Sequence, residues 1–279
     1  MDADPEKLLI DRFGEYPHPP IAGIATPLMA KILSRRTHRT YTSEPVGEEL
    51  LDLLLAAAMS ASSKSDFQQV SIIKLKDSQK RQRIGAHFPL MPWIATSPVF
   101  LVFCADARRL ERICALRNHP QRNGDIEAFL NASVDAALAM QTFILAAESV
   151  GLGCCPISVI RNQMGAVAHE LALPDGVFPV AGLCAGYPAG KGYVSMRLPL
   201  SITIHTDTYD DAALEAQIDA YDRRRAANHT LKREQQRNPN LFGYADFYGW
   251  SEDKARQAAE PEGASFARYL RSHGFSFES

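Results

Sequence analysis

The chain has 279 residues, of which 46% are hydrophobic and 22% are charged, a composition typical of a globular protein with one large domain or two small ones. Its 30 basic and 32 acidic residues give a net charge of −2, which excludes the strongly basic surface that binds nucleic acid or anionic membranes. The longest apolar runs have about seven residues, whereas a membrane-spanning helix needs about 20, so we expect no such helix.

The N-terminus and the cysteines favour a cytoplasmic protein. The first six residues lack the basic and apolar regions of a secretory signal peptide. The five cysteines are an odd number and lie in apolar runs, which is typical of buried thiols in a reducing compartment. The adjacent Cys154 and Cys155 could have a redox role, but two small apolar side chains on opposite faces of a strand are the simpler interpretation.

Prolines and apolar periodicity predict the elements in chain order. Residues 1–28 are rich in proline and are predicted to form an extended N-terminal arm. Short helices are expected over residues 29–34 and 48–59. Strands are expected at residues 69–75, 98–104, 154–160, 178–185 and 201–205.

The stretch 124–150 is the most informative predicted helix. Its apolar residues leave little polar surface, which indicates burial in a core or in a subunit interface. We favour a dimer interface, with a core helix of a single chain as the alternative.

The remaining pattern is helical. Helices are predicted over residues 162–171, 212–226 and 251–272, the last interrupted by Pro261. Helices and strands do not alternate regularly, so the predicted class is α+β. We expect one domain over residues 29–226 and a C-terminal extension over residues 227–279 that wraps the domain or a partner subunit.

Several common catalytic and nucleotide-binding motifs are absent from the sequence. There is no Walker loop and no Gly-x-Ser-x-Gly turn, and the glycines at 151 and 153 follow a helix and lack a third glycine. The histidines and cysteines have no zinc-ligand spacing, so no metal site is predicted.

The candidate binding site consists of arginines and short hydroxyl side chains. Planar guanidinium groups beside a hydroxyl match the oxygens of a phosphate group. Each of these groups of residues, taken alone, would more often be ordinary solvent-exposed surface. The residues are Arg35, Arg36, Thr37, Arg39, Ser62, Ser63, Ser65 and Arg197.

Taken in order along the chain, these segments resemble the nitroreductase superfamily. The resemblance covers about residues 30–226 and rests on residues 35–39, 61–69, 102–106, 146–153, 157–162, 179–188 and 197–199. Within the superfamily the chain is most similar to the oxygen-insensitive NADPH nitroreductases and flavin reductases. This implies an α+β fold with a mixed central sheet flanked by helices, a homodimer with the long helix at its interface, and one FMN at each interface.

The resemblance also implies which residues contact FMN. The phosphate or ribityl end is assigned to Arg35, Arg36, Thr37, Arg39, Ser195 and Arg197. The loop and the ring contacts are assigned to Ser62, Ser63, Ser65, Phe67, Gln68, Pro156, Ile157 and Ser158. The sequence departs from the family's usual residues at Arg35, Lys64, Met91, Pro156, Ser158 and Ser195.

The implied reaction is a two-electron, ping-pong hydride transfer from NADPH or NADH to a small-molecule acceptor, which is a nitro compound, a quinone or a flavin. The chemistry takes place at N5 of FMN, so no side chain is assigned as a catalytic group. Arg223, Arg224 and Arg225 are candidates for the 2′-phosphate of NADPH, with a solvated helix end as the alternative.

Three other functions stay open at this point. One is a dedicated reductase for a single metabolite or for free flavin. Another is a flavin-binding protein with little turnover. The last is an interaction patch that uses the arginines without a cofactor.

Overall fold

The computed structural model describes residues 4–14, 26–122, 126–263 and 265–275, and these residues form two compact units. The sheet unit comprises Arg36–Gly192 and Gly263–Ser279, and the helical unit comprises Met1–Arg35 and Tyr193–Glu262.

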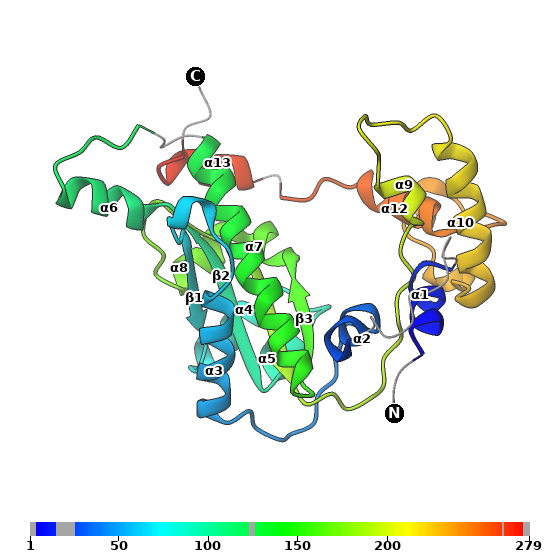
Figure 1. Ribbon diagram of the computed structural model, residues 1–279, viewed down its shortest axis with the longest axis horizontal. Helices are drawn as coiled ribbons and strands as arrows, with labels where there is room; N and C mark the ends of the chain where they lie inside the picture. Colours follow the sequence, from blue (N-terminus) through cyan, green and yellow to red (C-terminus); the bar gives the residue numbers. More distant parts are fainter. Residues whose placement is uncertain (1–3, 15–25, 123–125, 264, 276–279) are drawn as a thin grey trace. The chain divides into compact units, whose positions relative to one another are not determined.

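The sheet unit contains four strands and the helices that cover them (Figure 1). Its strands are β1 (Val70–Lys74), β2 (Val99–Asp106), β3 (Gly153–Ile157) and β4 (Val177–Gly186). Its α-helices are α3 (Glu48–Met59), α4 (Ser78–Ala86), α5 (Trp93–Thr96), α6 (Arg108–Leu116), α7 (Ile126–Ser149), α8 (Met164–Glu170) and α13 (Phe266–Ser272). Two 3-10 turns accompany them, η1 (Lys64–Asp66) and η2 (Ser158–Gln163).

The strands pair in the order β1-β2-β4-β3, and every one of these pairs is antiparallel. All eight residues of β2 are buried, as its run of apolar residues on both faces requires of a central strand. The edges of the sheet are therefore β1 and β3. The predicted α+β class is confirmed, and the only parallel pairing among the described residues is an isolated bridge from Thr37 to Cys154.

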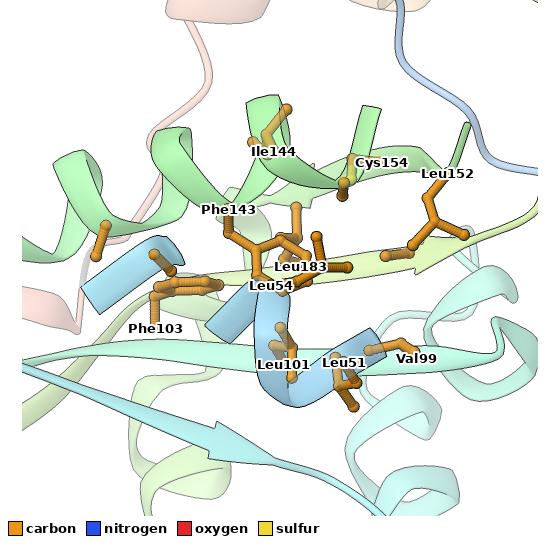
Figure 2. Packing of buried hydrophobic residues seen from close by; sticks show 14 of the residues in the cluster. Leu51, Leu54, Val99, Leu101, Phe103, Phe143, Ile144, Leu152, Cys154 and Leu183 are labelled. Atoms are coloured by element: carbon orange, nitrogen blue, oxygen red, sulfur yellow. The ribbon is translucent and has the colours of Figure 1, made fainter. Parts of the chain in front are cut away.

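Helices α3 and α7 pack side by side on one face of the sheet (Figure 1). Leu51 and Leu54 of α3 lie one turn apart and meet Phe143 of α7 over Leu101 and Phe103 of β2 (Figure 2). On the opposite face, a second cluster contains residues of α4, α5 and α8. The spacing of the buried residues on α3 is that of one face of an α-helix.

Helix α7 is long and apolar enough to cross a membrane by length and composition alone. Its packing against α3 and β2 accounts for part of that composition, because the face of the helix that lies on the sheet buries its apolar residues in the core. A buried aspartate, Asp135, lies in the middle of the helix.

The helical unit contains only helices among its described residues. They are α1 (Pro5–Phe13), α2 (Pro27–Leu33), α9 (Leu200–Thr203), α10 (Leu214–Asn228), η3 (Arg233–Gln235), α11 (Pro239–Phe242) and α12 (Trp250–Ala258). Asp222 of α10 is buried and accepts a hydrogen bond from the backbone N–H of Ser251 at the start of α12 (3.1 Å).

Two predictions about local structure were wrong. Residues 5–13 are helical rather than extended, because Asp4 caps the helix by accepting from the N–H of Glu6 (3.0 Å) and Pro5 stands at its first position, where proline is tolerated. Residues 201–205 were predicted as a strand, but Leu200–Thr203 is the short helix α9. The other prolines of the predicted arm, apart from Pro27, lie outside the described residues. The predicted domain boundaries at residues 28 and 226 stay predictions.

Candidate functional site

The residues 36–39, called here the arginine segment, lie beside the edge strand β3. Thr37 forms the bridge to Cys154, and the backbone N–H of His38 donates to the carbonyl of Cys154 (3.0 Å). Gly153 permits this approach, since a Cβ built there would lie 2.7 Å from Cγ of His38. The segment is therefore held as an additional, short strand at the edge of the sheet.

Both arginines of the segment have a defined neighbour. The guanidinium of Arg36 donates to the carbonyl of Lys191 (3.0 Å). The guanidinium of Arg39 lies over the ring of Trp93, 5.8 Å from its centroid, a cation–π arrangement. Arg39 is exposed, and among the described residues no carboxylate forms an ion pair with it. It is available to an anion from outside.

The residues Pro156, Ile157 and Ser158 end the same strand, so the structure brings them close to the arginine segment. Ile157 is buried in the core, whereas Pro156 and Ser158 are exposed. Consecutive residues of a strand point to opposite faces, which explains this alternation.

The residues 62–69, called here the serine loop, lead into β1. Ser65, Asp66 and Gln68 have φ values of 49°, 57° and 53°, in the left-handed region that L-residues other than glycine rarely occupy. Each such residue costs about 1–3 kcal/mol unless its surroundings impose the conformation. Within the loop, Ser63 Oγ accepts from the N–H of Gln68 (3.1 Å).

Two side chains from other elements hold the serine loop. Asp135 of α7 accepts from the backbone N–H of Lys64 (3.0 Å) and of Gln69 (2.9 Å). From the other side, Arg109 of α6 donates to the carbonyls of Gln68 and Val70. Asp106 forms an ion pair with the same arginine (2.8 Å).

The serine loop and the arginine segment lie far apart within one sheet unit. The serine loop precedes β1, and the arginine segment adjoins β3, at the opposite edge of a four-stranded sheet. From β1 through β2, β4 and β3 to the segment there are four strand spacings, which correspond to about 19 Å. Along the strands, Val70 is level with Ala105 and Cys154 is level with Val99, a further separation of about 20 Å. Within one copy of the chain, the two groups therefore do not lie together in one small binding site.

In the helical unit, Arg12 of α1 connects two segments that carry predicted site residues. Its side chain is 6% exposed and donates to the carbonyls of Leu33 (2.9 Å), Ser195 (2.9 Å) and Arg35. Its own carbonyl accepts from the N–H of Arg197 (2.6 Å). Residues 33–35 and 195–197 are thereby fixed side by side.

The three arginines of α10 differ in their surroundings. Arg225 donates to the carbonyl of Met196 (3.0 Å) and to the hydroxyl of Tyr221 (2.8 Å), so it has a structural role within the helical unit. Arg224 packs closely against Gly14. Arg223 is exposed, so its guanidinium is accessible to a ligand.

Four of the five cysteines, Cys104, Cys154, Cys155 and Cys184, are buried. Cys154 and Cys155 belong to the two clusters on opposite faces of the sheet, as the simpler interpretation predicted. Burial raises the pKa of Cys184 and of Cys104 to about 12, which keeps these thiols protonated at neutral pH.

Sequence reasoning missed Arg12, Arg109 and Asp135. Arg12 lies in a segment that was predicted to be extended, and α6, which carries Arg109, was not predicted. Asp135 could have been found, because it is an acidic residue in the middle of an otherwise apolar stretch of helix.

Comparison with known proteins agrees with this architecture. Residues 32–187 match the model of the nitroreductase family, and residues 195–278 match the model of its C-terminal domain. The chain is 38% identical over 200 residues to FMN reductase [NAD(P)H] of Bacillus subtilis, which covers 70% of this chain and 80% of that protein. It is 35% identical over 196 residues to an oxygen-insensitive NADPH nitroreductase of Salmonella typhimurium, with the same two coverages.

Solved structures give the same result for the fold. B. megaterium NfrA2 has a TM-score of 0.81 and 31% identity, and the match covers 91% of this chain and all of that one. The NADPH:FMN oxidoreductase from Vibrio harveyi, complexed with NAD⁺, has a TM-score of 0.77 and 28% identity over 90% of this chain and 99% of that one. The chain therefore belongs to the nitroreductase family.

Proposed function

We propose that this protein is an FMN-dependent NAD(P)H oxidoreductase that reduces small acceptors of the nitro, quinone or flavin type. The observation that carries the proposal is the arginine segment, which β3 holds in place with the Arg39 guanidinium exposed and without an ion-pair partner among the described residues. Relatives named FMN reductase and NADPH nitroreductase support it. We place the protein in the cytoplasm.

The residues of the sheet unit fit FMN. A phosphate dianion needs permanent cations and hydrogen-bond donors, which Arg36, Arg39 and the hydroxyl of Thr37 provide on one short segment. Near them, the buried Nε1 of Trp93 has no acceptor among the described residues, which is typical of a site that a polar ligand completes. Arg197 of the helical unit stays a predicted phosphate ligand.

When bound, FMN supplies the hydride acceptor for NAD(P)H and the two-electron donor for the acceptor substrate. The side chains then have the tasks of binding and orientation. Arg36 and Arg39 neutralise the phosphate, while the serine loop and the end of β3 offer backbone groups and an apolar surface to the ring. We assign no side chain as an acid or a base.

We further propose that the protein is a homodimer in which each flavin site draws on both copies. The separation of the serine loop from the arginine segment supports this arrangement. So does α7, where Ile126, Leu130, Val134 and Leu138 follow one another at four-residue intervals and are 40–56% exposed. Such a continuous apolar stripe on a helix marks an interaction surface.

For the coenzyme we propose NADPH, with Arg223 as the group that contacts its 2′-phosphate. Arg223 is the exposed member of the three arginines, and a phosphate monoester prefers a guanidinium partner. Arg224 and Arg225 support the helix from which Arg223 projects.

The proposed function is tested with the purified protein in two steps. Its visible spectrum is recorded and the chromophore is released with acid, and we expect FMN at about one per chain. NADPH is then added without oxygen, and we expect rapid bleaching that an added quinone or nitroaromatic reverses. A bound flavin that NAD(P)H does not bleach would favour a flavin-binding protein, and a colourless protein that takes up no FMN would overturn the proposal.

A further inference from the structure

The serine loop has a backbone shape that its own sequence does not favour. Ser65, Asp66 and Gln68 all have left-handed φ values, and none of them is glycine. Inside the loop, Gln68 donates to Ser63 and to Asp66, and the N–H of Phe67 donates to the carbonyl of Lys64 (2.9 Å). Contacts from other elements must therefore hold its conformation.

The strongest of those contacts comes from Asp135. This carboxylate is only 2% exposed, and both of its oxygens accept backbone hydrogen bonds, Oδ1 from Lys64 and Oδ2 from Gln69. The two amides bracket the three left-handed residues. Within the described residues no arginine, lysine or histidine forms an ion pair with Asp135, and the two amides are its hydrogen-bond donors there. A buried carboxylate is costly unless its oxygens accept hydrogen bonds, so Asp135 stabilises the loop geometry in which both amides point toward it.

Arg109 holds the same loop from the outside. It donates to the carbonyls of Gln68 and Val70 and to Oγ of Ser71 (2.7 Å), while Asp106 fixes the guanidinium. Around Gln68 and Gln69 the amide side is thus held by Asp135 and the carbonyl side by Arg109. The two anchors hold opposite ends of one peptide group, because the carbonyl of Gln68 and the N–H of Gln69 belong to the same peptide bond.

Asp135 also belongs to the helix that carries the exposed apolar stripe. Val134 and Leu138, its neighbours on α7, are exposed on the stripe, whereas Asp135 points into the chain toward the serine loop. A shift of α7 would therefore move the amides of Lys64 and Gln69 with it.

We propose that Asp135 is a positioning residue for the flavin site, which holds the serine loop in its ring-binding shape and couples that shape to helix α7. The proposal rests on the proposed function, because it takes the serine loop as a contact of the flavin ring. Asp135 itself does not touch the cofactor. Arg109 is the second positioning residue, acting on the same loop.

The test compares Asp135→Asn with Asp222→Asn in the full-length protein. Asparagine keeps the size of the side chain, but its amide N cannot accept the second backbone N–H. Asp222 is the matched control, because it is also buried and accepts a backbone N–H, but it lies in the helical unit. The dissociation constants of FMN and of riboflavin are measured by fluorescence quenching on the flavin-free proteins.

We expect Asp135→Asn to raise the dissociation constants of FMN and of riboflavin by the same factor, at least about tenfold. The reason is that the substitution disturbs the ring end of the site and leaves the phosphate end intact. Asp222→Asn should change neither constant by more than about twofold. Hydrogen exchange should speed up at the amides of Lys64 and Gln69 in the Asp135 variant. Unchanged affinities together with unchanged exchange would overturn the proposal.

Arg109→Lys provides a second variant that does not disturb the core, because the arginine side chain is 41% exposed. Lysine cannot donate to two carbonyls and a hydroxyl with one planar fork. We expect a smaller loss of affinity than for Asp135→Asn, again equal for FMN and riboflavin. A loss of affinity confined to FMN would contradict the proposal. If the unmodified protein binds no flavin, the proposed function fails. If it binds flavin and both variants bind it equally well, this inference alone fails.

Discussion

The arginine segment and the serine loop reach their shapes in different ways. The arginine segment is an extended piece of backbone that pairs with β3 through Thr37 and His38, and Gly153 leaves room for it. The serine loop has three left-handed residues, and its shape depends on Asp135 and Arg109, which lie on other elements. One half of the site is thus held by backbone pairing with a strand, and the other half by side chains that project from two helices.

We therefore expect substitutions to impair the two halves of the site in different ways. Strand pairing involves backbone groups, so substitutions in the arginine segment remove charges and leave its shape in place. In the serine loop, a substitution far away along the chain changes the shape without removing a ligand-binding side chain. The phosphate end and the ring end of a flavin report on these two kinds of failure separately.

The largest expected effect is that of Arg36→Ala combined with Arg39→Ala. Hydrogen bonds to a charged group contribute about 1.5–3 kcal/mol each. The loss of two guanidinium groups that contact the phosphate should therefore weaken the binding of FMN about 10²–10⁴-fold. Riboflavin, which has no phosphate, should bind with nearly unchanged affinity. Equilibrium titration of both flavins measures this contrast, with Arg83→Ala on α4 as the control. Equal losses for both flavins would show that the segment does not bind the phosphate.

The next effect concerns the apolar stripe of α7. Leu138→Asp places a charge on a surface that we expect to be buried between two copies, so the dimer should dissociate at micromolar concentrations. Flavin should be lost with it, because each site draws on both copies. Sedimentation velocity measures the change, and Tyr209→Asp, at an exposed aromatic outside the stripe, is the control. A variant that stays dimeric and keeps its flavin would exclude the stripe as the interface.

A smaller effect is expected for Arg12→Ala in the helical unit. Removing a buried guanidinium leaves the carbonyls of Leu33, Arg35 and Ser195 without their donor, which should lower the free energy of unfolding by about 3 kcal/mol. Lys7→Ala is the control, since its exposed ion pair with Asp11 contributes less than about 1 kcal/mol. Urea unfolding measures the free energy of unfolding of both variants. Equal midpoints for the two variants would mean that Arg12 does not hold residues 33–35 and 195–197 together.

The smallest effect is that of Arg223→Ala on coenzyme choice. An exposed guanidinium that contacts a phosphate contributes about 1–1.5 kcal/mol, so the KM for NADPH should rise about tenfold. The KM for NADH, which has no 2′-phosphate, should not change and serves as the internal control. Steady-state kinetics with both coenzymes measures the two KM values. An equal rise of both would contradict the assignment of Arg223 to the 2′-phosphate.

The sequence predicted the parts of the molecule whose cause is local. The central strand β2, the long helix α7 and the break at Pro261 follow from apolar runs, from helical periodicity and from proline. The arginine segment was recognised because its residues are adjacent. The capped helix α1 and the short helix α9 were missed, since capping by Asp4 and the context of residues 200–203 outweighed proline content and apolar alternation.

The sequence did not show which backbone groups Asp135 and Arg109 hold. Asp135 lies about 70 residues from the amides that it holds, and no pattern of spacing links a buried acceptor to donors in a distant loop. Arg109 lies on a helix that was not predicted. What the sequence did offer was the presence of a carboxylate in an apolar helix, which indicates a buried, paired group without naming its partner.

In the proposed dimer, one flavin site takes the arginine segment from one copy and the serine loop from the other. Mixing two inactive variants tests it most directly, namely Arg36→Ala/Arg39→Ala and Phe67→Asp, after unfolding and refolding them together. If the site is shared, each mixed dimer contains one intact site and one doubly altered site, and random pairing restores about a quarter of the FMN-binding capacity of the unmodified protein. If both groups belong to the same copy, every site keeps one defect, and mixing restores no binding at all.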